Sequence, residues 1–98
     1  MLNLVTQDGV KKVAVDSYQV KNCTGRTYKI YGENNGTTAG ELAEYEEFDD
    51  AVKVFQSMVL AETHDTFVVL PDDDPKEIAD FLAVMAEAFG AYPWKRKK

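Results

Sequence analysis

The chain has 98 residues, of which 45% are hydrophobic and 29% charged, with six glycines, three prolines and one cysteine. This length supports one globular domain with one core and excludes a multidomain enzyme. Because the apolar content is ordinary and Cys23 is alone, the composition also excludes a disordered tail, a collagen-like repeat and a scaffold held by internal disulfides.

The net charge of −6 is distributed unevenly along the chain. Residues 1–40 contain five Lys/Arg and three Asp/Glu, whereas residues 41–87 contain two Lys/Arg and fourteen Asp/Glu. The last four residues, Lys95, Arg96, Lys97 and Lys98, are all basic. An acidic block of this size produces a field over one side of a small domain, although surface charge also serves solubility.

Targeting segments, membrane spans and repeats indicate the compartment and the domain organisation of a chain. No stretch approaches the roughly eighteen apolar residues of a membrane span, and Met1 to Leu4 lack the basic start and apolar core of a signal peptide. We therefore expect a cytoplasmic protein without a membrane span. Without internal repeats or linkers, the sequence predicts a single domain over residues 1–94 and a basic tail over residues 95–98.

The first half of the chain predicts an antiparallel sheet. Asp8-Gly9 between two β-leaning runs is typical of a hairpin turn, and alternation of apolar and polar side chains indicates strands with one buried face. Gly32 to Gly36 predicts a loop with an Asn-Gly turn. The expected result is a β-meander of four or five strands. The predicted strands cover residues 2–6, 10–15, 18–23, 26–31 and 38–45.

At Phe48 the hydrophobic period changes, which predicts an amphipathic helix of about fourteen residues that covers a face of the sheet. Asp49 or Asp50 is expected to cap this helix. Its solvent side is expected to contain Lys53, Gln56 and Ser57. Its apolar side comprises Val52, Phe55, Met58 and Val59, widened by Ala51, Val54 and Leu60.

A short strand is predicted at residues 66–70, ending at Pro71. A second helix then begins with Asp74 as the N-cap, Pro75 at the first helical position and Glu77 as partner in a capping box. This helix is expected to end at Gly90. Its apolar positions are Ile78, Phe81, Leu82, Met85 and Phe89. The predicted fold class is α+β, a β-meander packed by one amphipathic helix, with one further short strand and a C-terminal helix.

Residues able to carry catalysis are few. His64 is the only histidine and is expected in an exposed connection, whereas Cys23 is expected as a half-buried apolar group in a strand. Asp72-Asp73-Asp74 lacks the spacing of a calcium loop and is interpreted as compensation of the helix dipole. The glycines of residues 32–40 are not followed by the Lys-Ser/Thr of a phosphate loop. We therefore predict no enzymatic activity, no cofactor and no metal.

An acidic stretch at the predicted strand-to-helix junction is the first candidate binding surface. It comprises Glu44, Tyr45, Glu46, Glu47, Phe48, Asp49 and Asp50. Together with the rest of the acidic face over residues 41–87, its carboxylates can imitate a phosphate backbone and enter a protein groove built for nucleic acid, with Tyr45 and Phe48 as anchors. The alternative is a solvated surface without a partner.

Two other binding modes are open. The tail residues Lys95, Arg96, Lys97 and Lys98 could contact nucleic-acid phosphates, supported by Lys11, Lys12, Lys21, Arg26 and Lys29 from the predicted strands. In that tail region Trp94 is expected to pack back onto the domain. Alternatively, the apolar face of the second helix between Ile78 and Phe89 could pair with its copy in a homodimer.

The opening Met1-Leu2-Asn3-Leu4-Val5-Thr6-Gln7-Asp8-Gly9, followed by Val13-Ala14-Val15, resembles short uncharacterised proteins encoded by phages and prophages of Gram-positive bacteria. The block from Gly40 to Val54, a strand ending in tyrosine followed by a capped helix, is similar to the same group, as is the strand from Phe67 to Pro71. The helix from Pro75 to Phe89 departs from it, because chains of the group often end soon after the proline.

This resemblance implies a bacterial cytoplasm during infection or lysogeny and a role carried by surface contacts, but no site residues. The leading hypothesis is a non-enzymatic phage or prophage accessory protein that binds a host or phage protein through the acidic stretch. Its target would be a nucleic-acid-handling or defence protein. Nucleic-acid binding and a self-associating structural subunit are the alternatives.

Overall fold

The computed structural model describes residues 1–23, 25 and 27–89. The α+β class and the order of strands and helices predicted from the sequence are confirmed. In chain order the elements are β1 (Leu2–Val5), β2 (Lys12–Val15), β3 (Ser17–Asn22), β4 (Tyr28–Asn34), β5 (Thr37–Tyr45), α1 (Phe48–Thr63), β6 (Val68–Val69) and α2 (Pro75–Phe89).

The strands of the described residues are divided between two three-stranded sheets. In the first sheet, β1 pairs antiparallel with β2 and parallel with β6, with Leu4 opposite Val68 and Val5 opposite Val69. In the second sheet, β3, β4 and β5 form an antiparallel meander of three strands, whereas the predicted meander had four or five because it also counted the strands that became β1 and β2. The strand β6 is shorter than the predicted run of residues 66–70, and it lies at the edge of its sheet.

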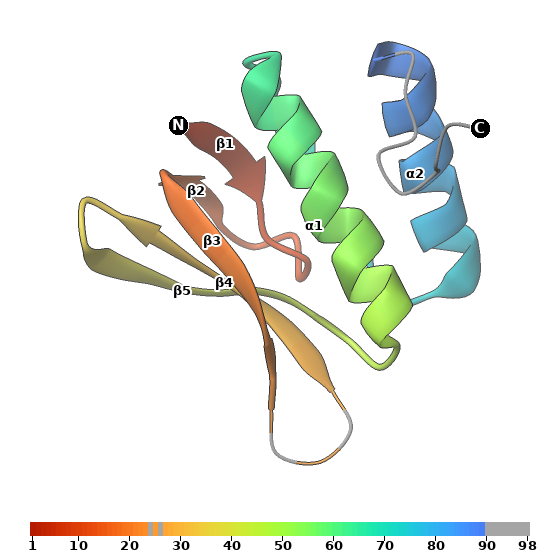
Figure 1. Cartoon of the computed structure of the whole chain (residues 1–98), viewed down its shortest axis with the longest axis horizontal. Helices are drawn as coiled ribbons and strands as arrows, with labels where there is room; N and C mark the ends of the chain where they lie inside the picture. Colours follow the sequence, from red (N-terminus) through yellow and green to blue (C-terminus); the bar gives the residue numbers. More distant parts are fainter. Residues whose placement is uncertain (24, 26, 90–98) are drawn as a thin grey trace, which may run out of the picture.

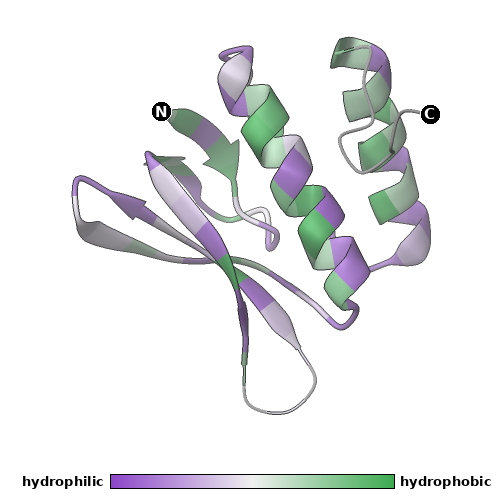
Figure 2. Ribbon diagram, viewed as in Figure 1, coloured by the Kyte–Doolittle hydropathy of each residue, from purple (hydrophilic) through white to green (hydrophobic). Residues whose placement is uncertain are grey.

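Helix α1 lies between the strands and α2 (Figure 1), and it contacts β1, β3, β4 and β5 as well as α2. Hydrophobic residues recur along β1 and both helices, whereas the turn that leads into α1 is hydrophilic (Figure 2). Both sheets and both helices contribute to one core. Its buried side chains include Leu2, Leu4, Val15, Ile30, Leu42, Tyr45, Val54, Met58, Val68, Ile78 and Met85.

Gly32 lies inside β4, so the loop predicted from Gly32 to Gly36 was too long. The turn consists of Asn35 and Gly36, whose φ angles of 55° and 78° lie in the left-handed region that Asn-Gly favours. Gly32 serves a different purpose. A Cβ atom there would lie 2.6 Å from Val15 Cγ1 and 2.9 Å from Leu42 Cδ1. The glycine therefore allows the two sheets to approach each other.

The start of α1 differs from the prediction. The helix begins at Phe48 with Glu47 as its N-cap residue, so the predicted capping by Asp49 or Asp50 was wrong. Both aspartates lie in the first turn, where the positive end of the helix dipole favours negative charge. At α2 the predicted N-cap is confirmed, because the Glu77 backbone N–H donates to Asp74 Oδ2 at 3.1 Å and the helix starts at Pro75. The predicted capping box was wrong, because the Asp74 backbone N–H donates to the Asp72 carbonyl oxygen at 2.8 Å instead of to the Glu77 side chain.

The buried surface of α1 also differs from the predicted stripe. Ser57, expected in solvent, is fully buried, and Val59, expected on the apolar side, is 43% exposed. The physical reason is that α1 contacts the sheets and α2 at the same time, so its buried surface extends beyond one face. None of the helices within the described ranges is long and apolar enough to cross a membrane.

Residues 90–98 lie outside the described residues. The domain boundary at residue 94, the helix end at Gly90, the packing of Trp94 and the basic tail therefore stay predictions.

Candidate functional site

The residues of the predicted acidic stretch have different environments. Tyr45, at the end of β5, is fully buried and donates its hydroxyl hydrogen to the Pro71 carbonyl oxygen at 2.6 Å. A buried side chain cannot contact a partner, so the structure gives Tyr45 a structural role instead of the expected role as an anchor. Glu44 and Asp50 are half-buried, whereas Glu46, Glu47 and Asp49 are exposed.

Phe48 is the exposed aromatic residue of this stretch. Its side chain is 55% exposed, and its ring centroid lies 5.2 Å from that of Tyr28. The contact with Tyr28 holds one side of the Phe48 ring against β4, while the rest faces solvent beside the acidic residues. Phe48 therefore retains the geometry expected of an anchor.

The fold brings a second acidic segment to this stretch. The Glu46 backbone N–H donates to Asp73 Oδ2 at 3.1 Å, and the starts of α1 and α2 lie side by side (Figure 1). We call the combined surface the acidic pole. It comprises Glu46, Glu47, Asp49 and Asp50 from the start of α1, and Asp72, Asp73, Asp74 and Glu77 from the start of α2.

The sequence predicted one acidic face over residues 41–87 but did not predict which of its segments lie next to each other. More than twenty residues separate these two acidic segments in the chain, and the local signal at Asp74 was fully explained by helix capping. Only the path of β6 and its connection to α2 places Asp73 beside Glu46. We see no sequence pattern that would have predicted this juxtaposition.

The carboxylates of the acidic pole repel one another. Burial and the nearby Asp73 carboxylate raise the pKa of Asp50. The Asp72 carboxylate, followed by partial burial, raises the pKa of Glu77. The positive charge of Lys53 offsets part of this repulsion at Asp50. Lys53 Nζ lies 3.9 Å from Asp49 Oδ2. Raised pKa values in a carboxylate cluster indicate that a cationic partner would stabilise it.

The groups considered for catalysis are held by local contacts. His64 is exposed at the C-terminus of α1, where Nδ1 lies 2.9 Å from the Leu60 carbonyl oxygen. Cys23 is partly buried after β3, and its Sγ lies 3.8 Å from the Tyr31 hydroxyl. In the described part of the chain, no group of three or more His, Cys, Asp or Glu side chains is arranged to hold a metal ion.

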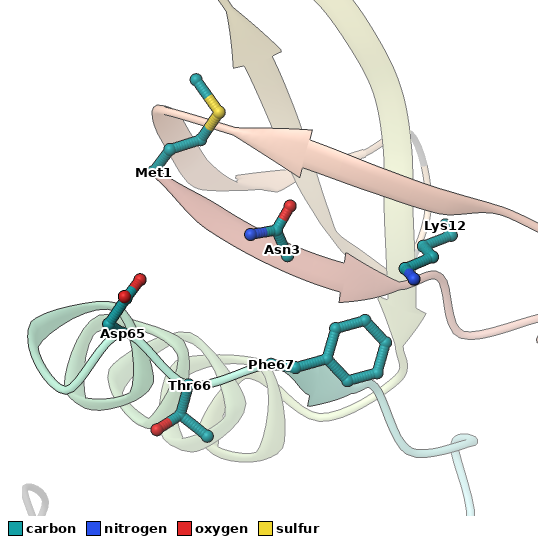
Figure 3. Close-up of a pocket in the computed structure, with 6 residues that line it drawn as sticks. All are labelled: Met1, Asn3, Lys12, Asp65, Thr66 and Phe67. Carbon is teal, nitrogen blue, oxygen red and sulfur yellow. The ribbon is translucent and has the colours of Figure 1, made fainter.

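The lysines of the predicted strands are divided between the two sheets. Lys12 belongs to the first sheet, where its Nζ lies 5.4 Å from the centroid of the Phe67 ring. These two side chains line a cavity of about 360 Å³ and point toward each other (Figure 3). In the second sheet, Lys29 pairs with Glu41 at 2.9 Å, and Lys21 lies over Tyr31.

Lys11 is exposed in the turn that leads to β2. Arg26 and the tail residues Lys95, Arg96, Lys97 and Lys98 lie outside the described residues.

The motif that carries the resemblance to phage proteins has structural roles. Thr6 donates its hydroxyl hydrogen to Asp8 Oδ1 at 2.6 Å, and the Val10 backbone N–H donates to the same carboxylate oxygen at 3.0 Å. These two hydrogen bonds lower the pKa of Asp8. Gly9 has a φ angle of 75°, which closes the turn between β1 and β2. The motif therefore builds the turn between β1 and β2.

No protein-family model, curated protein or solved structure matches this chain. The resemblance to phage and prophage proteins therefore stays a prediction from the sequence.

Proposed function

We propose that the protein is a non-enzymatic binding protein whose acidic pole enters a basic groove of a nucleic-acid-handling or defence protein. The observation that carries the proposal is the hydrogen bond from Glu46 to Asp73, which joins two acidic segments into one surface. The further proposal that the protein acts as a phage or prophage accessory factor in a bacterial cytoplasm rests on the sequence resemblance.

Electrostatics supports this function. The acidic pole contains eight carboxylates, and repulsion contributes to the raised pKa values of Asp50 and Glu77, although Lys53 offsets part of it at Asp50. A basic groove would relieve this repulsion and would also accelerate association through long-range attraction. Such a groove normally binds the phosphates of nucleic acid, so an acidic protein surface can compete for it.

Phe48 supplies the apolar part of the proposed contact. Interfaces usually depend on a few buried aromatic residues surrounded by polar contacts. The half-exposed Phe48 ring lies within the acidic pole, directly between Glu47 and Asp49 in sequence. Charge would therefore attract the partner, and Phe48 would add short-range affinity.

The experiment is capture of partners from the bacterial cytoplasm by the tagged full chain, with nuclease treatment and at two salt concentrations. The test variant is Glu46→Lys/Glu47→Lys, and the matched control is Glu33→Lys/Glu87→Lys. Each variant replaces two glutamates by lysines, so both change the net charge equally. All four residues are exposed, so neither variant disturbs the core.

We expect to capture a nucleic-acid-handling protein. Its capture should survive nuclease treatment and be lost at high salt, and the test variant should capture about tenfold less of it than the control. Equal capture by the two variants would contradict binding through the acidic pole. Capture that disappears with nuclease would instead indicate nucleic-acid binding.

A further inference from the structure

A second exposed apolar surface lies between β6 and α2, in addition to the one at Phe48. Phe67, Val69 and Val84 are 45%, 57% and 65% exposed, although all three are large hydrophobic residues. Together with Val68, Asp80, Phe81 and Met85 they line a cavity of about 300 Å³, to which Asp80 contributes a carboxylate at the rim of mostly apolar side chains. Exposed apolar residues that gather in one hollow usually mark an interaction site. We call this cavity the apolar end, because it is the first of two neighbouring cavities between β6 and α2.

The hollow continues toward the acidic pole. A neighbouring cavity of about 400 Å³ shares Val69 and Phe81 with the first and is also lined by Asp8, Asp72 and Glu77. We call it the acidic end. The two cavities adjoin at Val69 and Phe81, and we call them together the β6–α2 groove. Its apolar end lies near Val84 and its acidic end near Glu77, and Asp72 and Glu77 belong to the acidic pole.

The backbone of β6 is available along this groove. Within the described residues, β6 has a neighbouring strand only at β1. The Leu70 backbone N–H donates to the Val5 carbonyl oxygen at 3.1 Å. Since successive residues of a strand direct their backbone groups to opposite sides, Val69 directs its N–H and C=O away from β1. An added strand can pair with these groups.

We propose that the β6–α2 groove binds an extended peptide segment of a partner protein that carries apolar side chains at one end and Lys or Arg at the other. The segment would pair with the free edge of β6. Its apolar side chains would enter between Phe81 and Val84, and its basic side chains would lie against Asp72 and Glu77. This proposal rests on the proposed function, because it assigns a second part of the partner to the acidic pole.

Charge complementarity decides in favour of such a segment over a second copy of the chain. Two copies related by a twofold axis bring the same surface together. A twofold axis along the groove would bring the two acidic ends together, where the raised pKa of Glu77 already indicates repulsion. An axis across the groove would place each acidic end against the apolar end of the other copy, so neither arrangement supplies cations to Asp72 and Glu77. A basic peptide would remove that repulsion.

The probe is a fluorescent peptide of sequence Thr-Trp-Thr-Val-Thr-Lys-Thr-Lys, together with the reversed sequence, because β6 can pair in either direction. Alternation places the tryptophan, valine and lysine side chains on one face of an extended peptide. A control peptide has glutamate in place of lysine. Binding to the full chain is followed by fluorescence anisotropy. We expect a Kd on the order of 10–100 μM for one direction and none for the control peptide.

Three variants test the parts of the groove. Val84→Lys should weaken peptide binding about tenfold, whereas Val59→Lys, at an exposed valine of α1 outside the groove lining, should leave it unchanged. Glu77→Lys should weaken binding about tenfold, whereas Glu87→Lys should have little effect. Val69→Pro removes an outward N–H and should weaken binding about fivefold, with folding checked by circular dichroism.

Several outcomes would overturn the proposal. The proposal is wrong if neither peptide direction binds at millimolar concentration. It is also wrong if Val84→Lys and Val59→Lys weaken peptide binding equally. A concentration-dependent dimer that Val84→Lys dissociates would assign the groove to a second copy. Binding only after Lys95, Arg96, Lys97 and Lys98 are changed to serine would assign it to the chain's own C-terminal segment.

The inference and the proposed function can fail separately. If the peptides do not bind but Glu46→Lys/Glu47→Lys still prevents partner capture, the acidic pole functions and the groove proposal is wrong. If the peptides bind with the expected effects of Val84→Lys, but capture is insensitive to the Glu46 and Glu47 changes, the groove stands and the proposed function is wrong.

Discussion

Gln7 connects segments that lie far apart in the chain. Its Nε2 donates to the carbonyl oxygens of Glu44 at 2.9 Å and Pro71 at 3.2 Å, and its Oε1 accepts from the Glu44 N–H at 2.9 Å. Its backbone N–H donates to the Leu42 carbonyl oxygen at 2.9 Å. One residue therefore attaches the β1–β2 turn to β5 and to the connection between β6 and α2.

Gln7→Ala should lower the free energy of unfolding by about 2 kcal/mol, because it leaves partly buried backbone groups of Glu44 without their partner. For a chain of this length the melting temperature should fall by about 10 °C. Urea unfolding followed by circular dichroism measures the change. Gln19→Ala, at an exposed position of β3, is the control. A loss below about 0.5 kcal/mol would show that Gln7 does not hold the sheets together.

Gly32 limits how closely the two sheets approach. Gly32→Ala should destabilise the protein by about 1–3 kcal/mol, because the added Cβ would lie within 3 Å of side-chain atoms of Val15 and Leu42. Thermal unfolding of this variant should be compared with Glu33→Ala, an exposed change in the same strand. Partial rescue by Leu42→Val would confirm that crowding between the sheets is the cause, and unchanged stability of Gly32→Ala would refute it.

At the level of elements, the connection between β6 and α2 is fastened at Pro71. The Pro71 carbonyl oxygen accepts from the Tyr45 hydroxyl at 2.6 Å and from Gln7 Nε2 at 3.2 Å. Burial, followed by the Asp73 charge, raises the pKa of Tyr45, so its hydroxyl remains a donor at neutral pH. These contacts link the end of β5, the β1–β2 turn and the start of α2, and thereby position Asp73 in the acidic pole.

Tyr45→Phe should cost about 1 kcal/mol, because Gln7 still satisfies the Pro71 carbonyl oxygen. The double variant Gln7→Ala/Tyr45→Phe should cost more than the two single variants together, since it removes the last donor to that oxygen. Urea unfolding of all four proteins completes the cycle, and Tyr28→Phe controls for loss of a hydroxyl elsewhere. Additive changes would mean that the two donors do not share the carbonyl.

For the whole molecule, the acidic pole makes stability depend on pH. The pKa of Asp50 is raised above its ordinary value of 3.8 in the folded chain. The folded chain therefore binds a proton at a higher pH than the unfolded chain. By linkage, stability decreases as the pH rises through the raised pKa, and the repulsion is fully present at neutral pH.

Asp50→Asn should therefore be more stable than Asp49→Asn at about pH 7 by a few tenths of a kcal/mol. Both variants lose a first-turn carboxylate, so the comparison removes the contribution of the helix dipole. The difference should shrink as the pH falls through the raised pKa of Asp50, and also at high salt. Urea unfolding across this pH range measures it. A difference that does not change with pH would exclude repulsion as its origin.

The success of the sequence prediction followed the range of the interactions involved. Asn35-Gly36 and Asp74-Pro75 were predicted correctly because the turn and the cap depend on residues adjacent in the chain. Ser57 was misplaced because its burial depends on the position of α1 relative to both sheets and α2. Gly32 was misinterpreted for a similar reason, since its neighbours Val15 and Leu42 are distant in sequence.

The sequence by itself determined the α+β class, the order of the elements, the N-cap of the second helix at Asp74 and the acidic character of the second half, because local periodicity and composition decide these properties. Only the tertiary structure decided the division of strands into two sheets, the parallel pairing of β6 with β1, and the acidic pole. It also placed Val69 beside Val84 in one groove. These features depend on which distant segments share a core, and no local pattern specifies that choice.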